Sequence, residues 1–353
     1  MVLTESKRRK IWYKIFLLIQ ACYTYNMFRW VIFGKEPFTR KAQLLGMILA
    51  YFGLHSVGWN WGIRNNVSQI WNTMVQWERQ FLKDKPLNKV KESANQMAVQ
   101  FLRLVCTILL YFTVPNYALF NMVLVYFDWC QRPYFGASTL FCTDKGDWIG
   151  PSLPYWLPVL AAETFLNYAL TFGGVVWLFN LYIPGIGCFL DDSPPSFAAM
   201  RQNISIYRQL HVLERLFNDF IIRACLPIML SVMPGIQIMS MFGCFRFLGK
   251  MTLLQFQIFP LMGFSAMLCN VVSSTLSSFI FTDSTALMTC FKTAAVRIEG
   301  SKREGKILRR ELWSCTSLKI KFGSNFVDGG TPLVLQDFCW TQTVSLMLVM
   351  DNK

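Results

Sequence analysis

Thr331 to Met350 reads TPLVLQDFCWTQTVSLMLVM, a stretch whose one charged side chain is Asp337. At about 1.5 Å of rise per residue, a helix of this length crosses the roughly 30 Å hydrocarbon core of a bilayer. Similar apolar windows recur six times earlier in the chain. The stretch therefore predicts the last helix of a membrane bundle, and the recurrence predicts an all-α membrane protein.

The composition also indicates a polytopic membrane protein. Of the 353 residues, 54% are hydrophobic, 16% are aromatic and 15% are charged, whereas about 25% of a soluble chain is charged. The formal net charge of +14 could indicate nucleic-acid binding, but the lysines and arginines lie in segments that alternate with apolar runs. This alternation is typical of cytoplasmic loops in membrane proteins. We therefore expect a lipid bilayer, and no nucleic acid, as the partner.

Seven windows fit the length of a membrane span. They are Ile11 to Phe33, Ala42 to Ile63, Met97 to Trp129, Tyr155 to Phe189, Ile221 to Phe247, Met251 to Phe281 and Thr331 to Met350. The third, fourth and sixth are longer than a span requires, so we expect them to tilt, break or continue outside the bilayer. The prolines Pro115, Pro184 and Pro234 are the expected kinks.

The distribution of basic residues sets the orientation of these spans. With the N-terminus inside, about two thirds of the lysines and arginines fall in cytoplasmic segments, which the positive-inside rule favours. The basic cluster Lys7 to Lys10 precedes an apolar stretch that is too long for a signal peptide. The sequence thus predicts a cytoplasmic N-terminus, a retained first span and an extracellular C-terminus.

The charged segments between the spans have helical periodicity. Ile206, Leu210, Leu213, Leu216 and Phe217 lie on one face of a helix. Apolar residues recur in the same way among the basic residues that precede Gly323. We expect cytoplasmic helical extensions that pack into an intracellular layer; the alternative is amphipathic helices that lie on anionic lipid.

Several stretches of the chain resemble a known family of receptors. They are Tyr207-Arg208-Gln209-Leu210 continuing to Asn218, Leu308-Arg309-Arg310-Glu311-Leu312, Ser317 to Gly323 and Thr341-Gln342-Thr343-Val344-Ser345-Leu346. In these stretches, in the number of spans and in their orientation, the chain resembles the arthropod gustatory and odorant receptor superfamily. Gustatory receptors commonly carry Thr-Tyr, five residues and Gln-Phe in the last span. The corresponding positions here are Thr343, Val344, Met350 and Asp351, of which only the threonine matches, so the resemblance is to a divergent member.

The resemblance implies a chemosensory receptor of the plasma membrane that acts as a ligand-gated cation channel. It implies a tetramer, of identical or different subunits, whose last helices line a central pore for monovalent and divalent cations. It also implies a pocket for a small organic ligand, a tastant or an odorant, in the outer half of each subunit. Cofactors, metal sites and enzymatic activity are not expected.

The predicted organisation follows from the spans and the resemblance. It comprises a cytoplasmic N-terminal tail (1–10), a six-helix ligand-binding bundle (11–281) with cytoplasmic loops 64–96 and 191–219, a cytoplasmic helical anchor segment (282–330) and the pore-lining last helix (331–353).

Polar groups at membrane depth are the candidates for ligand binding, because their burial in lipid is costly. His55 follows Tyr51 by one helical turn, and Asn167 follows Glu163 in the same way. An outer cavity lined by these four residues, together with Tyr117 and Asn121, suits a small organic molecule. The alternative is that Glu163 and His55 satisfy each other or a neighbouring backbone.

The last span contains candidate pore residues. Its polar members include Gln336, Asp337, Thr341, Gln342, Thr343 and Ser345, and an apolar run follows them. Gln342 and Thr343 suit a water-filled pore, Met347 and Met350 a hydrophobic constriction, and Asp351 a mouth that attracts cations. The alternative is that these polar residues make hydrogen bonds between helices.

Gly329 and Gly330 separate the anchor segment from the last helix. Glycine gives the backbone freedom, and Pro332 suits the start of a helix. We expect a hinge that couples the ligand to the pore; the alternative is a simple helix boundary.

Two other protein classes remain as alternatives. A G-protein-coupled receptor would have an extracellular N-terminus, and its long basic loops would face outward. A secondary transporter would use Glu163 as its coupling site. Enzyme motifs of the GxSxG, HExxH and Walker A types are absent from the sequence. Cys130 and Cys142 bracket a loop on the predicted outside and are either bonded or free.

Overall fold

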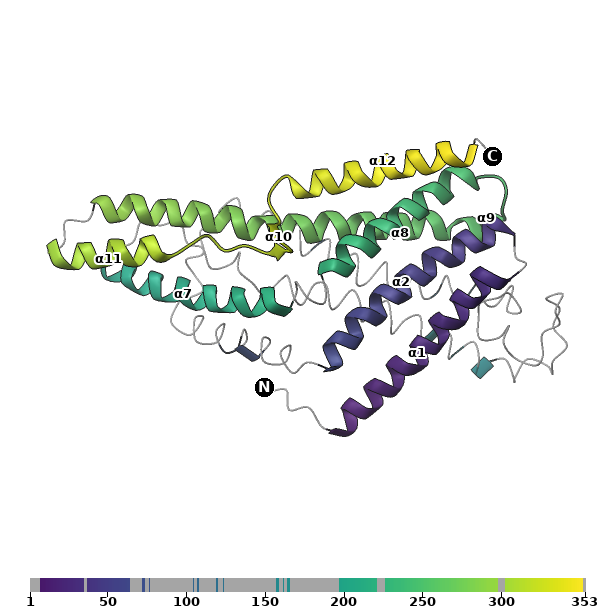
Figure 1. The fold of residues 1–353 in the computed structure, drawn as a ribbon, viewed down its shortest axis with the longest axis horizontal. Helices are drawn as coiled ribbons and strands as arrows, with labels where there is room; N and C mark the ends of the chain where they lie inside the picture. The colour runs from purple at the N-terminus through teal and green to yellow at the C-terminus, as the bar shows by residue number, and fades with distance from the viewer. Residues whose placement is uncertain are drawn as a thin grey trace.

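The computed structural model describes residues 7–34, 37–63, 197–220, 226–297 and 302–351, with isolated helical positions between 72 and 165. The described helices are α1 (Lys7–Phe33), α2 (Phe38–Ile63), α7 (Phe197–Phe220), α8 (Leu226–Arg246), α9 (Leu253–Phe256), α10 (Ile258–Arg297), α11 (Lys302–Ser314) and α12 (Thr331–Asp351). A short hairpin of β1 (Lys321–Phe322) and β2 (Asn325–Phe326) precedes α12. The described residues are thus mostly helical, as predicted, apart from this hairpin (Figure 1).

Two of the described helices are long and apolar enough to cross a membrane. They are Ile258–Val296 and Thr331–Met350, within α10 and α12. The last helix begins at the residue that the sequence predicted. The predicted spans Met97 to Trp129 and Tyr155 to Phe189 lie outside the described ranges.

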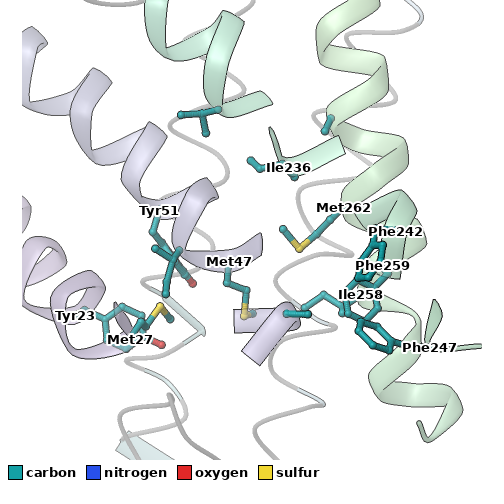
Figure 2. Close-up of a cluster of buried hydrophobic side chains, with 14 residues drawn as sticks. Tyr23, Met27, Met47, Tyr51, Ile236, Phe242, Phe247, Ile258, Phe259 and Met262 are labelled. Carbon is teal, nitrogen blue, oxygen red and sulfur yellow. The ribbon is translucent and has the colours of Figure 1, made fainter. Parts of the chain in front are cut away.

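The centre of the bundle is α8, which packs against α2, α10 and α12. Figure 1 shows α12 running beside α8 and one half of α10, while α1 and α2 lie on the other side. Buried side chains of α1, α2, α8 and α10, with Phe247 after α8, form the core cluster drawn in Figure 2, which includes Tyr23, Met27, Met47, Tyr51, Ile236, Phe242, Phe247, Ile258, Phe259 and Met262. Pro234, one of the predicted kink positions, lies inside α8.

Two glycines, one on α8 and one on α10, allow these helices to approach closely. A Cβ atom placed on Gly243 would overlap the ring of Phe259. At Gly263, a Cβ atom would lie 3.1 Å from the Cβ of Ser240. The interface between these helices is therefore close-packed, and the aromatic rings of the core cluster fill the space around it.

The helix α10 is 40 residues long, or about 60 Å at the usual rise per residue. It passes without a break from the predicted sixth span into the predicted anchor segment, so the boundary at residues 281 and 282 lies within one helix. Its second half carries α7 and α11 on its sides (Figure 1). A rigid helix thus joins the part of the molecule near α12 to the opposite end.

The predicted packing of the intervening helices is also seen. Leu210 of α7, Phe291 of α10 and Leu312 of α11 belong to a second buried cluster. We call the assembly of α7, α11, the second half of α10 and the chain from 315 to 326 the end layer. Because the apolar faces of α7 and α11 are buried in protein, the alternative of helices lying on lipid is wrong for them. Leu216 is the exception to the predicted face, because it is exposed.

Candidate functional site

The helix α12 has one buried face. Cys339 and Thr343 are 0% and 1% exposed, and the Thr343 hydroxyl donates to the carbonyl oxygen of Cys339 at 2.8 Å. Leu346, Met347 and Met350 are partly buried against the core cluster. Residues three or four positions apart share a helix face, so these five side chains face the bundle.

The opposite face of α12 carries a polar stripe, which consists of Asp337, Thr341 and Ser345. The three residues are four positions apart and all are exposed. The Ser345 hydroxyl donates to the carbonyl oxygen of Thr341 at 2.8 Å. Leu348 continues the stripe and is also exposed. The exposed side of the last helix thus carries a line of polar residues among exposed apolar ones such as Leu333, Val344 and Val349.

The predicted pore residues fall on both faces of α12. Gln342 is exposed beside the polar stripe, whereas Thr343, Met347 and Met350 lie on the bundle side. Asp351 ends α12, and its side chain is outside the described part. The helical period explains the division, because positions 343, 347 and 350 recur at the spacing of a single face.

Three side-chain amides, two of them buried, connect α12 to the bundle. Gln237 of α8 donates from Nε2 to Oε1 of Gln336 at 2.7 Å. Its own Oε1 accepts a hydrogen bond from Nδ2 of Asn270, on α10, at 2.8 Å. Gln237 is 0% exposed and Asn270 is 5% exposed. We call these residues the amide triad. The predicted alternative, hydrogen bonding between helices, therefore holds for Gln336.

A second contact holds the other end of α12. Nη2 of Arg246, at the end of α8, donates to the carbonyl oxygen of Met350 at 3.4 Å. A positive charge near the C-terminal carbonyls of a helix is also favoured by the helix dipole. The last helix is thus attached to α8 near both of its ends, and its rotation about its own axis is restricted.

In the end layer, side chains hold an extended segment that pairs with no strand among the described residues. Residues 315–320 run between α7 and α10. Asn218 Nδ2 donates to the carbonyl oxygen of Lys319 at 2.7 Å, and its Oδ1 accepts from the Lys321 N–H at 3.1 Å. Oε1 of Glu214 accepts from the Lys319 N–H at 3.1 Å. Buried backbone groups need such partners, and α7 supplies them as a neighbouring strand would.

The same segment is held at its start and at its middle. The hydroxyl of Tyr207 donates to the Thr316 carbonyl oxygen at 2.7 Å, and Oγ of Ser284 on α10 accepts from the Leu318 N–H at 3.0 Å. Burial, followed by the nearby Cys315 and Glu214, raises the pKa of Tyr207 well above its usual value. The phenol therefore stays protonated and remains a donor. We call the contacts of α7 and Ser284 with 315–321 the backbone clamp.

His211 adds a polar contact to the clamp. Its Nε2 lies 2.9 Å from Oγ1 of Thr316, and its Nδ1 lies 3.0 Å from Oε2 of Glu214. The second contact is an ion pair when the imidazole is protonated.

The hairpin leads from the clamp into α12. Lys321 pairs with Phe326 in the antiparallel register, and Gly323 occupies the turn with a φ of 57°. Such a two-residue turn needs a residue that tolerates positive φ. The Lys319 ammonium lies over the rings of Phe326 and Phe281, at 4.7 and 5.7 Å from their centroids. The hairpin is therefore fastened to α10 as well as to α7.

A turn at Asp328 begins the last helix. Its Oδ1 accepts from the N–H of Gly330 at 3.1 Å, the N–H of Thr331 at 3.0 Å and the Thr331 hydroxyl at 2.8 Å. Among the described glycines, only Gly249 and Gly323 have positive φ. The predicted hinge glycines, Gly329 and Gly330, thus lie in a hydrogen-bonded turn whose φ angles other residues can adopt.

Two of the predicted ligand-binding residues can be placed. Tyr51 is 4% exposed in the core cluster, and its ring meets that of Tyr23 edge to face, with 5.7 Å between the centroids. His55 is half-buried one turn later on α2. The remaining four, which are Tyr117, Asn121, Glu163 and Asn167, lie outside the described residues, as do Cys130 and Cys142.

The structure adds polar residues that the sequence analysis did not select. Gln237 and Asn270 are uncharged, so a search for ionisable groups at membrane depth passed over them. Their signal was an amide in the middle of an apolar window. Glu214 and Asn218 are one helical turn apart on α7, and that spacing indicated a shared polar position.

No protein-family model and no curated protein matches the sequence. The fold, in contrast, matches solved structures of the insect olfactory receptor OR5 from Machilis hrabei. The structure of the receptor itself aligns with a TM-score of 0.59 and 11% identity over 98% of this chain and 90% of that chain. The structure of its complex with eugenol aligns with a TM-score of 0.61 and 10% identity, over 98% and 91%. This likeness concerns the fold, and it shows that the chain has the fold of an insect olfactory receptor.

Proposed function

We propose that the chain is a chemosensory receptor subunit that forms a ligand-gated cation channel in the plasma membrane. The observation that carries this proposal is the polar stripe of α12, which an apolar helix presents on the side away from its own bundle. Polar groups at membrane depth are unfavourable in lipid. Four copies of α12 around an axis would place the stripe on water. The fold match to an insect olfactory receptor supports the chemosensory part of the proposal.

The polar stripe also revises which side chains line the proposed pore. Asp337, Thr341 and Ser345 face the axis, with Gln342 beside them, and Leu348 supplies the apolar constriction that closes by dewetting. Met347 belongs to the bundle side, where it packs on the core cluster.

The proposed ligand is a small organic molecule. The relative with the matching fold has been solved with eugenol, which belongs to that class. We place the pocket in the bundle beside α2, near His55, with the predicted residues Tyr117, Asn121, Glu163 and Asn167 as further candidates. The amide triad joins α8 to α12, and it therefore offers a direct route by which a change in the bundle reaches the pore.

Topology provides the first test of this function. An epitope at the C-terminus should be accessible from outside intact cells. The N-glycosylation sequons Asn66-Val67-Ser68 and Asn203-Ile204-Ser205 should carry no glycan, because both lie in predicted cytoplasmic loops. A cytoplasmic epitope, or a glycan on either asparagine, would contradict the proposal and would favour a receptor with an extracellular N-terminus.

Current provides the second test. Cells that express the chain should show a cation current when a panel of volatile and soluble organic molecules, eugenol included, is applied. Untransfected cells are the control. A compound that the cells accumulate without passing current would favour a transporter instead.

A further inference from the structure

The single charge in the apolar stretch of α12 has an unusual position. Asp337 lies six residues after Thr331, or about 9 Å along the helix. Its side chain is exposed, and it makes no ion pair with any described residue. A carboxylate at this depth is costly in lipid, so it is expected to face water or a cation.

The register of α12 fixes the direction of this carboxylate. Gln336 is held to Gln237 by the amide triad, and Cys339 is fully buried on the same side. Asp337 and Cys339 are two positions apart, which is about 200° around the helix. Asp337 therefore points away from α8 and α10, along the face that α12 turns outward at the edge of the bundle (Figure 1).

The positive charge of the end layer bears on the role of the Asp337 carboxylate. The end layer next to the start of α12 is basic, and Arg309, Arg310 and Lys321 are exposed on it. A positive entrance would favour anions. The other described carboxylate near the start of α12 belongs to Asp328, which is engaged in three hydrogen bonds.

We propose that Asp337 is the residue that sets the charge selectivity of the pore, as a ring of carboxylates contributed by the subunits near the inner end of α12. The ring concentrates cations and offsets the basic end layer. Thr341 and Ser345 continue the hydrated path beyond it. This inference rests on the proposed channel function, because it requires the polar stripe to face the pore axis.

Two thiol reagents of opposite charge test the local potential without an agonist. Thr341→Cys places a thiol one helical turn beyond Asp337, or about 6 Å along the axis and within the Debye length of physiological saline. The full-length variant, in cell membranes, is treated with the cationic trimethylammonium-ethyl methanethiosulfonate or the anionic sulfonatoethyl methanethiosulfonate. Mass spectrometry of the tryptic peptide that follows Lys321 counts the adducts, and the buried native Cys339 in that peptide is the internal reference.

We expect the cationic reagent to react faster, and Asp337→Asn in the Thr341→Cys background to lower the ratio of the two rates roughly tenfold. Asp337→Glu should keep the ratio high because it retains the charge. Asp328→Asn is the matched control. It removes a carboxylate 13 residues from Thr341, about 20 Å along an extended helix axis, and should leave the ratio unchanged.

Two outcomes would overturn the inference in different ways. If Thr341→Cys reacts with both reagents and Asp337→Asn leaves the ratio unchanged, the selectivity role is wrong and the pore remains. If Thr341→Cys reacts with neither reagent, yet reacts with the membrane-permeant N-ethylmaleimide, the stripe faces lipid. In that case both the inference and the proposed channel fail.

Discussion

The amide of Gln237 on α8 is shared between the last helix and α10, because it donates to Gln336 at 2.7 Å and accepts from Asn270 at 2.8 Å. Replacing Gln237 with leucine would leave two amides in the bundle without this partner. We expect Gln237→Leu to destabilise the protein by about 1–2 kcal/mol.

The thermal midpoint of the detergent-solubilised protein measures this change. Gln342→Leu is the matched control, because it makes the same substitution on the exposed side of α12. Equal midpoints for the two variants would show that the amide triad does not hold the helix.

The backbone clamp protects the chain before the hairpin. Asn218→Leu removes both hydrogen bonds that Asn218 makes with the backbone of Lys319 and Lys321. Trypsin should then cut after these two lysines roughly tenfold faster, because local opening costs less free energy. Gln209→Leu, at an exposed position of the same helix, is the control, and trypsin should cut it at the rate of the natural protein. Unchanged cleavage in Asn218→Leu would contradict the clamp.

The close approach of α8 to α10 predicts a difference between two glycines of one helix. Gly243→Ala places a methyl group into the ring of Phe259, whereas Gly235→Ala places one 3.7 Å from Leu49, at an ordinary contact distance. Overpacking of this kind costs about 1–3 kcal/mol. Gly243→Ala should therefore melt at a lower temperature than Gly235→Ala. The reverse order would refute the close contact between Gly243 and the ring of Phe259.

Asp328 makes the start of α12 sensitive to acid. The hydroxyl of Thr331, and then the N–H groups of Thr331 and Gly330, lower the pKa of the Asp328 carboxyl. A carboxyl whose pKa is lower in the folded state stabilises that state above its unfolded pKa of about 3.9, and this contribution is lost as the pH falls through the folded pKa.

Hydrogen exchange of the Gly330 and Thr331 amides measures this effect. Their protection factors should fall as the pH drops below about 4. In Asp328→Asn they should not depend on pH over that range, because the side chain no longer titrates. The same pH dependence in both proteins would show that another group is responsible.

The helices near the C-terminus follow from sequence because their signals are local. The stretch from Thr331 to Met350 is apolar over the length of a membrane span and has a single charged residue, and α12 begins at Thr331. The apolar period around Leu210 and Leu312 likewise predicted α7 and α11, since a stripe of that width has to be buried.

Which side of α12 packs against the bundle could not be derived from the sequence of α12 alone. Thr343 and Thr341 are equally polar, yet one is buried and the other exposed. The choice depends on residues of other helices: Gln237 of α8 pairs with Gln336, and Asn270 of α10 pairs in turn with Gln237. A polar residue in an apolar helix can face a pore or bond to an amide of a neighbouring helix. Which of the two occurs depends on the residues of the neighbouring helices.

The extended segment 315–320 shows the same limit. Between residues 316 and 319 its backbone partners are the side chains of Tyr207, Glu214, Asn218 and Ser284. No short-range signal describes such an arrangement.

The backbone clamp also has a consequence for the order in which the chain folds. Its contacts between α7 and the extended segment join residues 101 to 109 positions apart. During synthesis, Glu214 and Asn218 emerge well before the peptide groups that they hold, so these side chains lack their backbone partners while α8 and α10 are made. Contacts this distant in sequence form late, because the loop between them has to close first. The last helix would then dock onto a bundle that is already assembled, and an error in α7 would first show itself as a failure to retain α12.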